Sequence, residues 1–307
     1  MKGRLLAYGL LVLPPLFWAG NFITGRYISE QIPAMSLSYW RWTLAMLIAL
    51  PLVFSSMWRQ RELIVRHWLV ISVLACLGVV SFNSCVYIGL QTTTATNALI
   101  INSMIPIFIL LLSSLCLGYK MSLRQGLGIG LSFLGVLVLL LKGQWQHLSQ
   151  LRINTGDGWI VLSSLVWALY SIGLRYKPSE LSGAAFLGCT LVIGSVVLSP
   201  FYWLNLPQAA FPLTHDTLWA LAYVAIFPSL LAYLAWNYGV KIVGAGIAGQ
   251  YIHLMPLFGA ILGLGLLGEQ LFAYHAWGAL FIALGLLVAL LPFNGAIRGW
   301  FSHFKTH

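Results

Sequence analysis

Ten stretches of mostly apolar residues run through this sequence, each about as long as a helix that crosses a lipid bilayer, which takes roughly 20 residues. They lie at residues 5–27, 34–54, 67–89, 93–118, 122–141, 157–175, 182–204, 217–239, 243–267 and 272–292. The links between them are too short to hold a soluble domain. Only 7% of the 307 residues are charged, against roughly 25% in soluble domains. The sequence therefore predicts an all-α integral membrane protein with ten transmembrane helices in a lipid bilayer.

The basic residues indicate how these helices are oriented. The net charge is +10, but the 16 Lys and Arg are scattered in small groups between the apolar stretches, which does not favour binding of nucleic acid. If the N-terminus is cytoplasmic, twelve of the 16 fall on the cytoplasmic side, and the others are Arg26, Arg41, Lys142 and Arg152. Because cytoplasmic loops are enriched in Lys and Arg, we expect a multi-pass inner-membrane protein with both termini in the cytoplasm. We also expect the first stretch to be a retained helix rather than a cleaved signal peptide.

The second half of the chain repeats the first. A shift of 150 residues aligns Pro106 with Pro256, and a shift of 149 aligns Trp18 with Trp167. In this repeat alignment each half holds five stretches, an odd number, so the second copy enters the membrane in the opposite orientation, as in secondary transporters built from inverted repeats. We predict a first five-helix repeat over residues 1–145, a second over residues 146–293, and a short cytoplasmic tail over residues 294–307.

Short motifs in both halves resemble those of the drug/metabolite transporter superfamily, specifically its EamA branch. They are Phe17-Trp18-Ala19, Arg41, Met255-Pro256-Leu257-Phe258, Leu267-Gly268-Glu269 and the run from Gly278 to Gly285. The resemblance implies a ten-helix carrier with a central cavity between its halves, which works by alternating access and commonly exports amino acids or related small metabolites. The first half departs from the pattern, since Leu117-Gly118-Tyr119 stands where a Gly-Glu pair often sits. Glu269 is therefore not expected to have a repeat-related partner.

Polar side chains inside the apolar stretches are candidates for the transport path, because such groups are costly in lipid unless they face protein or water. Asn83 and Tyr87 lie four residues apart on one helical face, and the repeat alignment places Tyr233 and Asn237 at the equivalent positions. We expect these four to face one another and to line the cavity. The alternative is that they only join helices by hydrogen bonds, which contribute about 1 kcal/mol each.

Two tryptophans with polar neighbours form a second candidate set. Trp18 with Asn21, and Trp167 with Tyr170, lie three residues apart on one face of their helices. Trp at mid-span either stacks on an apolar part of a substrate or packs in the core. Asn102, four residues before a proline, either faces the cavity or binds a freed carbonyl.

His253 lies on a face otherwise made of small residues, a face that packs on other helices, so its side chain is expected to point into protein. There it could couple transport to protons, donate a hydrogen bond to substrate, or simply be satisfied by a neighbour. Pro106 and Pro256 are expected to bend or open their helices near the middle of the membrane.

Arg41 lies seven residues after Ala34, about 10 Å along the helix from its outer end. Two interpretations remain open: it snorkels to the membrane interface beside Trp40 and Trp42, or it forms an anion site for a substrate carboxylate. The neighbouring tryptophans favour the snorkelling interpretation.

No pattern typical of an enzyme, a nucleotide-binding module, a cofactor or a metal site occurs in the sequence, and no catalytic residue is predicted. We therefore predict a secondary transporter that exports amino acids or related small metabolites, with protons as a candidate coupling ion. The alternative is an intramembrane enzyme that uses His253, which would need a second acid, base or metal ligand nearby.

Overall fold

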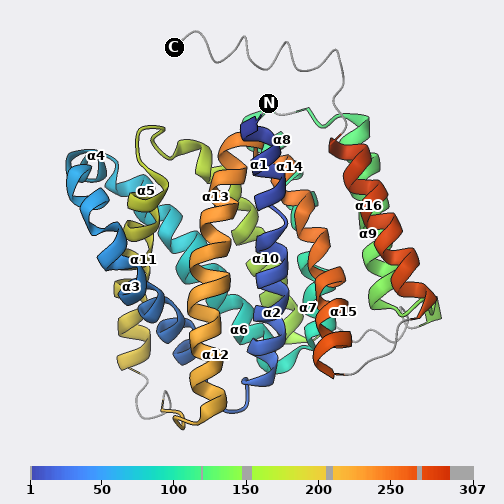
Figure 1. The fold of residues 1–307 in the computed structure, drawn as a ribbon, viewed down its shortest axis with the longest axis horizontal. Helices are drawn as coiled ribbons and strands as arrows, with labels where there is room; N and C mark the ends of the chain where they lie inside the picture. Colours follow the sequence, from blue (N-terminus) through green and yellow to red (C-terminus); the bar gives the residue numbers. More distant parts are fainter. Residues whose placement is uncertain (1, 119, 147–153, 205–209, 268–271, 291–307) are drawn as a thin grey trace.

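The computed structural model describes residues 2–118, 120–146, 154–204, 210–267 and 272–290, and the regular elements in these ranges are all helices (Figure 1). In the first half they are α1 (Lys2–Leu10), α2 (Leu13–Tyr27), α3 (Ala34–Arg59), α4 (Arg61–Arg66), α5 (Trp68–Ala75), α6 (Phe82–Thr92), α7 (Ala95–Asn102), α8 (Ile105–Leu117) and α9 (Leu123–Leu140). In the second half they are α10 (Thr155–Gly173), α11 (Gly183–Trp203), α12 (His215–Ala225), α13 (Ala232–Val243), α14 (Ala245–Gln250), α15 (Leu254–Leu267) and α16 (Ala273–Leu290).

Many of these helices join end to end into longer apolar runs that coincide with the predicted stretches. Within the described ranges, eight runs are long and apolar enough to cross a membrane, and α9 and α16 are two shorter apolar helices. The chain is therefore an all-helical, multi-pass membrane protein. Large apolar side chains on the outside agree with this, since Leu52 is 81% exposed and Leu115 is 72% exposed, as expected of a surface that meets lipid rather than water.

Helix ends follow local sequence signals. Ser122 and Gln125 form a capping box at the start of α9, and Asn154 and Asp157 form another at the start of α10. Gly118 ends α8 with a left-handed φ of 62°, a conformation that favours glycine. Gly118 belongs to the segment where the first half departs from the family pattern. The corresponding Gly268 and Glu269 of the second half lie outside the described residues.

The two halves pack on each other through contacts that come in reciprocal pairs. Gly89 in α6 lies against Ile160 in α10, and Gly239 in α13 lies against Leu11, between α1 and α2. The repeat alignment converts the first of these contacts into the second. Helix α6 of the first half thus packs on α10 of the second half, and α13, the equivalent of α6, packs where α1 meets α2.

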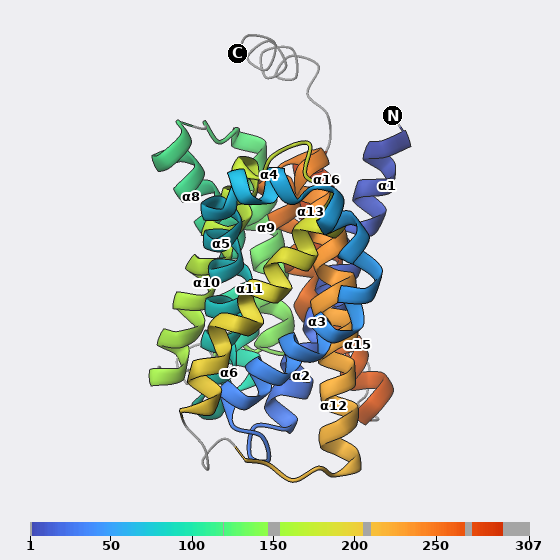
Figure 2. The ribbon, with the colours of Figure 1, turned by 90° about the vertical axis from the view of Figure 1, so that its left-hand side faces the viewer.

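Helices α9 and α16 also make reciprocal contacts, and they lie side by side at one edge of the bundle (Figures 1 and 2). A Cβ added to Gly128 would lie 2.7 Å from the carbonyl oxygen of Gly285, and one added to Gly135 would lie 2.7 Å from that of Gly278. Only glycine permits so close an approach of two helix backbones. Because the earlier residue of one helix meets the later residue of the other, α9 and α16 run antiparallel. The start of α1 and the end of α16 lie at the same end of the bundle (Figure 1).

Candidate functional site

The site lies where two helix runs are interrupted by π-helical turns. One turn, Cys76–Ser81, joins α5 to α6, and the other, Ile226–Leu231, joins α12 to α13. The repeat alignment superposes one turn on the other, so they occupy equivalent places in the two halves. Widening a helix to a π turn frees carbonyl oxygens from the usual helical bonds, and such turns occur often at functional sites.

The second π turn has a clear cause in the sequence. Pro228 has no N–H to donate to the carbonyl of Val224, and the Ser229 hydroxyl donates to that carbonyl instead, at 2.6 Å. In the first turn Gly78 occupies the place of Pro228, and a Cβ there would meet the ring of Tyr170 at 2.6 Å. The carbonyl oxygens of Gly78 and Pro228, one in each half, both accept hydrogen bonds from side chains in the centre of the bundle.

Asn83 and Tyr233 meet at the centre. The Asn83 amide nitrogen donates to the Tyr233 hydroxyl oxygen at 3.2 Å, and the Tyr233 hydroxyl donates to the Gly78 carbonyl. Both side chains are buried. These two residues are themselves equivalent in the repeat alignment, so a pair of equivalent positions is here in direct contact.

Two further Tyr–Asn pairs flank this contact, and their residue types are exchanged between the halves. The Tyr87 hydroxyl donates to Asn21 Oδ1 at 2.7 Å, and the Tyr170 hydroxyl donates to Asn237 Oδ1 at 2.8 Å. The repeat alignment carries Asn21 to Tyr170 and Tyr87 to Asn237. Of the four residues predicted to face one another, only Asn83 and Tyr233 do so. Tyr87 and Asn237 instead each bond to a residue of the Trp-containing set.

Arg41 lies in the middle of this cluster, and its side chain is fully buried, with 0% exposed. The interpretation that it snorkels to the interface is therefore wrong, and Trp42 is not interfacial either, since it is also 0% exposed and packs on the Tyr233 ring at 5.2 Å. Arg41 is buried although it lies only seven residues from the start of α3, because α3 packs against α6 of the first half and against α11 and α12 of the second half. The anion-site interpretation stays a prediction.

The guanidinium of Arg41 donates to five oxygens from both halves. Its Nη1 lies 3.0 Å from Asn21 Oδ1, 2.8 Å from Asn83 Oδ1 and 2.8 Å from the Tyr87 hydroxyl. Its Nε and Nη2 lie 2.5 Å from Ser229 Oγ and 3.2 Å from the Pro228 carbonyl oxygen. Sequence reasoning missed these last two partners, although a proline inside an apolar stretch signals freed helix carbonyls.

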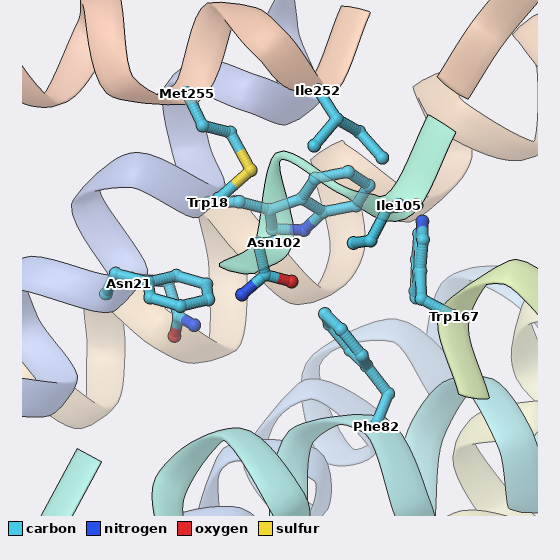
Figure 3. Close-up of a pocket in the computed structure, with 9 residues that line it drawn as sticks. Trp18, Asn21, Phe82, Asn102, Ile105, Trp167, Ile252 and Met255 are labelled. Carbon is cyan, nitrogen blue, oxygen red and sulfur yellow. The ribbon is translucent and has the colours of Figure 1, made fainter. Parts of the chain in front are cut away.

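A small cavity adjoins the cluster, and Figure 3 shows the side chains around it. It has room for about one water molecule. Four of the predicted residues line it, Trp18, Asn21, Asn102 and Trp167, together with Phe22, Phe82, Ile105, Ile252 and Met255. The other predicted residues are not among those that line it. Sequence reasoning missed the apolar members, which carry no signal that separates them from ordinary core.

The two tryptophans of the cavity pack edge to face, with ring centroids 4.9 Å apart. Trp18 and Trp167 are also equivalent residues of the two halves. Their indole nitrogens differ, however. Trp18 Nε1 donates to the Pro228 carbonyl at 3.2 Å, whereas Trp167 Nε1 is buried with no hydrogen-bond partner.

His253 points into protein, as predicted, and is fully buried. Its Nε2 donates to the carbonyl of Ser103, the equivalent residue of the first half, at 2.9 Å, and its Nδ1 has no partner. Both lie where helices are interrupted near a proline, as predicted for Pro106 and Pro256: α7 ends at Asn102, and α14 ends at Gln250. Within the described ranges no acid or second histidine bonds to His253, and no group of three His, Cys, Asp or Glu could bind a metal ion.

Comparisons with known proteins agree with this architecture. A model of the EamA-like transporter family matches residues 5–141 and 154–291. The chain is 28% identical over 299 residues to the uncharacterized transporter YyaM of Bacillus subtilis (strain 168), covering 95% of this chain and 94% of that relative. It is 30% identical over 286 residues to an uncharacterized transporter of Archaeoglobus fulgidus, covering 90% and 94%. The inner membrane protein YtfF of Escherichia coli (strain K12) is 28% identical over 277 residues, covering 81% and 84%.

Among solved structures, one crystal structure superposes on this chain with a TM-score of 0.72, covering 94% of this chain and 96% of that one. The sequence identity is 17%, so this likeness concerns the fold alone.

Proposed function

The chain belongs to the EamA-like transporter family, and from this membership and the geometry of the site we propose that it is a secondary transporter for amino acids or related small metabolites. It works by alternating access in the inner membrane. The direction, export, is proposed on the family resemblance alone. The observation that carries the proposal is a buried polar cluster, next to an aromatic cavity, to which both halves contribute residues.

The architecture behind this proposal is ten transmembrane helices in two inverted five-helix repeats, over residues 1–145 and 146–293. Three kinds of observation support it. The contacts between the halves are reciprocal, as at Gly89 and Gly239. Three hydrogen bonds join residues that are equivalent in the repeat alignment, namely Asn83 with Tyr233, Ser103 with His253, and Ser132 with Ile282. The family model also matches the two halves separately.

Equivalent residues of two copies can touch only where they lie on the two-fold axis that relates the copies. The three self-equivalent hydrogen bonds therefore support a two-fold axis through the centre of the bundle, and an axis in the membrane plane is the arrangement of inverted repeats. Substrate sites of such carriers lie near the bilayer midplane between the repeats. We propose that the Asn83–Tyr233 contact lies at that place in this chain.

Alternating access requires that the halves separate first at one end and then at the other. In the described conformation both ends are joined by contacts between the halves. Tyr27 donates to Asp216 at 2.9 Å at one end, and Ser56 and Ser182 are 2.8 Å apart at the other. The cavity between these ends is too small for a metabolite. We propose that breaking one of these contacts, while the other holds, opens the cavity to one side of the membrane.

Reconstitution into liposomes tests the proposal. Purified protein should exchange at least one of the labelled standard L-amino acids across the membrane, and Tyr233→Phe should lower that exchange because it removes the hydroxyl that bonds to the Gly78 carbonyl. Ser132→Ala is the matched control, since it removes another self-equivalent hydrogen bond, between α9 and α16, outside the cavity wall. Equal losses in both variants, per molecule of folded protein, would favour a packing role for the cluster. Absence of exchange for every solute would contradict the proposed function.

A further inference from the structure

Arg41 carries a permanent positive charge in a fully enclosed place. Its side chain is 0% exposed, and arginine keeps its proton under all conditions that a protein meets. All five oxygens that it contacts belong to neutral groups: two amides, a phenol, a hydroxyl and a backbone carbonyl. These groups solvate the charge without cancelling it.

No acidic side chain in the described part of the chain forms an ion pair with Arg41. Asp157 bonds to Thr93 and Asn154, and Asp216 bonds to Tyr27. Glu30, Glu62 and Glu180 are exposed. An enclosed charge without a counter-charge is costly to the fold, and ionisable residues kept within membrane spans mark the paths of ions and substrates.

The fold itself does not require this charge. The repeat alignment that carries Trp18 to Trp167 also carries Arg41 to Thr190, a buried residue whose hydroxyl bonds only within its own helix, to the Leu187 carbonyl. The π turn on which this helix, α11, packs is Cys76–Ser81, and it forms together with the Tyr170–Asn237 pair without a charge at this place. An uncharged residue therefore serves at the equivalent place, and packing alone does not account for Arg41.

Arg41 is one side chain away from the cavity. Asn21 accepts a hydrogen bond from Arg41 and also lines the cavity wall (Figure 3). Three oxygens share the two hydrogens of Nη1, so one of them can be given up without leaving this nitrogen unsatisfied. Rotation of Asn21 would expose the guanidinium to the cavity, where a carboxylate can accept one charge-assisted hydrogen bond from Arg41 and a second from the Asn21 amide nitrogen.

The remainder of the cavity suits an apolar body with an acceptor group. Trp18, Trp167, Phe82 and Met255 supply aromatic and apolar walls. The buried indole nitrogen of Trp167, which is a donor, has no hydrogen-bond partner. Acidic side chains, which would bind an ammonium group, do not occur among the residues that line it.

We infer that Arg41 anchors a carboxylate of the transported solute, so that the site takes small organic anions with an apolar or aromatic body in preference to neutral or cationic solutes. This inference rests on the proposed function and narrows its substrate class. A zwitterionic amino acid would bind through the same carboxylate, but its ammonium group finds no acidic partner in the cavity wall and must rely on the aromatic faces.

A matched series of ligands tests the inference. Hydrocinnamate, hydrocinnamamide, phenylalanine and phenylpropylamine share one aromatic body and differ in charge. Binding to purified protein in lipid nanodiscs is measured by calorimetry and by the shift in melting temperature. The wild-type protein should bind hydrocinnamate at least about tenfold more tightly than hydrocinnamamide, with phenylalanine between them and phenylpropylamine weakest, since a tenfold ratio corresponds to one good charge-assisted contact.

Three variants separate the charge from the fold. Arg41→Gln should reduce the preference for the carboxylate to less than about threefold, and Arg41→Lys should keep its direction. Arg61→Gln, at an exposed position, should leave it unchanged. The inference is overturned if hydrocinnamate does not bind, if the amide binds equally well, or if the preference survives in a folded Arg41→Gln protein. If one of these results is obtained and the liposomes still exchange a standard amino acid, the inference fails and the proposed function stands. If the liposomes exchange nothing, both fail.

Discussion

The two Tyr–Asn pairs of the central cluster are equivalent in position but differ in their surroundings. In one, Tyr87 donates to Asn21 at 2.7 Å, and in the other, Tyr170 donates to Asn237 at 2.8 Å. In the first pair, Asn21 Oδ1 and the Tyr87 hydroxyl also accept hydrogen bonds from Arg41. The second pair has no charged partner among the residues that the structure describes, and Asn237 is partly exposed rather than buried. The chain thus keeps a duplicated framework and places the charge in only one copy of it.

The freed carbonyls of the π turns differ in the same way. Gly78 accepts from the neutral side chains Asn83 and Tyr233. Pro228, its equivalent, accepts from Trp18 and from the cationic Arg41. Under the proposed alternating access, the two halves rock between two equivalent states, and a charge in only one half would give a bound solute a defined orientation. We therefore expect the first pair to matter for binding and the second mainly for packing.

The largest effect should separate Asn21 from Asn237. Asn21→Ala removes a ligand of Arg41 and part of the cavity wall, and a hydrogen bond to a charged group is worth about 1.5–3 kcal/mol, which corresponds to roughly a tenfold or greater loss of transport. Asn237→Ala removes a neutral hydrogen bond outside the cavity wall and should cost less than about threefold. Both rates are measured in liposomes per molecule of folded protein. Similar losses in the two variants would remove the distinction between the pairs.

A smaller difference is expected in stability. Tyr87→Phe deletes a hydroxyl that bonds to Arg41 and Asn21, and should lower the free energy of unfolding by about 1.5–3 kcal/mol. Tyr170→Phe deletes one that bonds to Asn237 alone, and should lower it by about 1 kcal/mol. Unfolding in mixed micelles by a denaturing detergent measures both. If Tyr170→Phe proved the more damaging change, the charge would not be what distinguishes the two pairs.

The smallest effect on exchange should come from His253→Gln. Glutamine keeps a donor for the Ser103 carbonyl but cannot gain a proton. The Nδ1 atom of His253 has no hydrogen-bond partner and can accept a proton. If His253 couples transport to protons, the variant should still exchange solute between equal pools, while a pH gradient should no longer drive accumulation. Accumulation driven by pH in the variant would show that protons are not coupled through this residue.

Sequence reasoning located the helices, the openings near Pro106 and Pro256, and most of the polar residues of the site, because apolar length and helix breakers are local properties. It did not predict that Tyr87 bonds to Asn21 and Asn237 to Tyr170, because a repeat reveals which positions are equivalent and not which ones touch. Contact between equivalents occurs on the axis, as for Asn83 and Tyr233. It also placed Arg41 at the interface, because distance along a helix does not reveal how deeply neighbouring helices bury a residue.

If the two halves share one site in opposite orientations, the loops after their first long helices face opposite sides of the membrane. Glu30 and Glu180 are exposed and lie in these equivalent loops. Each is changed to cysteine in a protein whose four native cysteines are replaced by alanine and which still transports. A membrane-impermeant maleimide is then applied to intact cells and to inverted membrane vesicles. We predict that Glu30→Cys is labelled from outside and Glu180→Cys from the cytoplasmic side. Labelling of both from the same side would contradict the inverted repeat and the shared site.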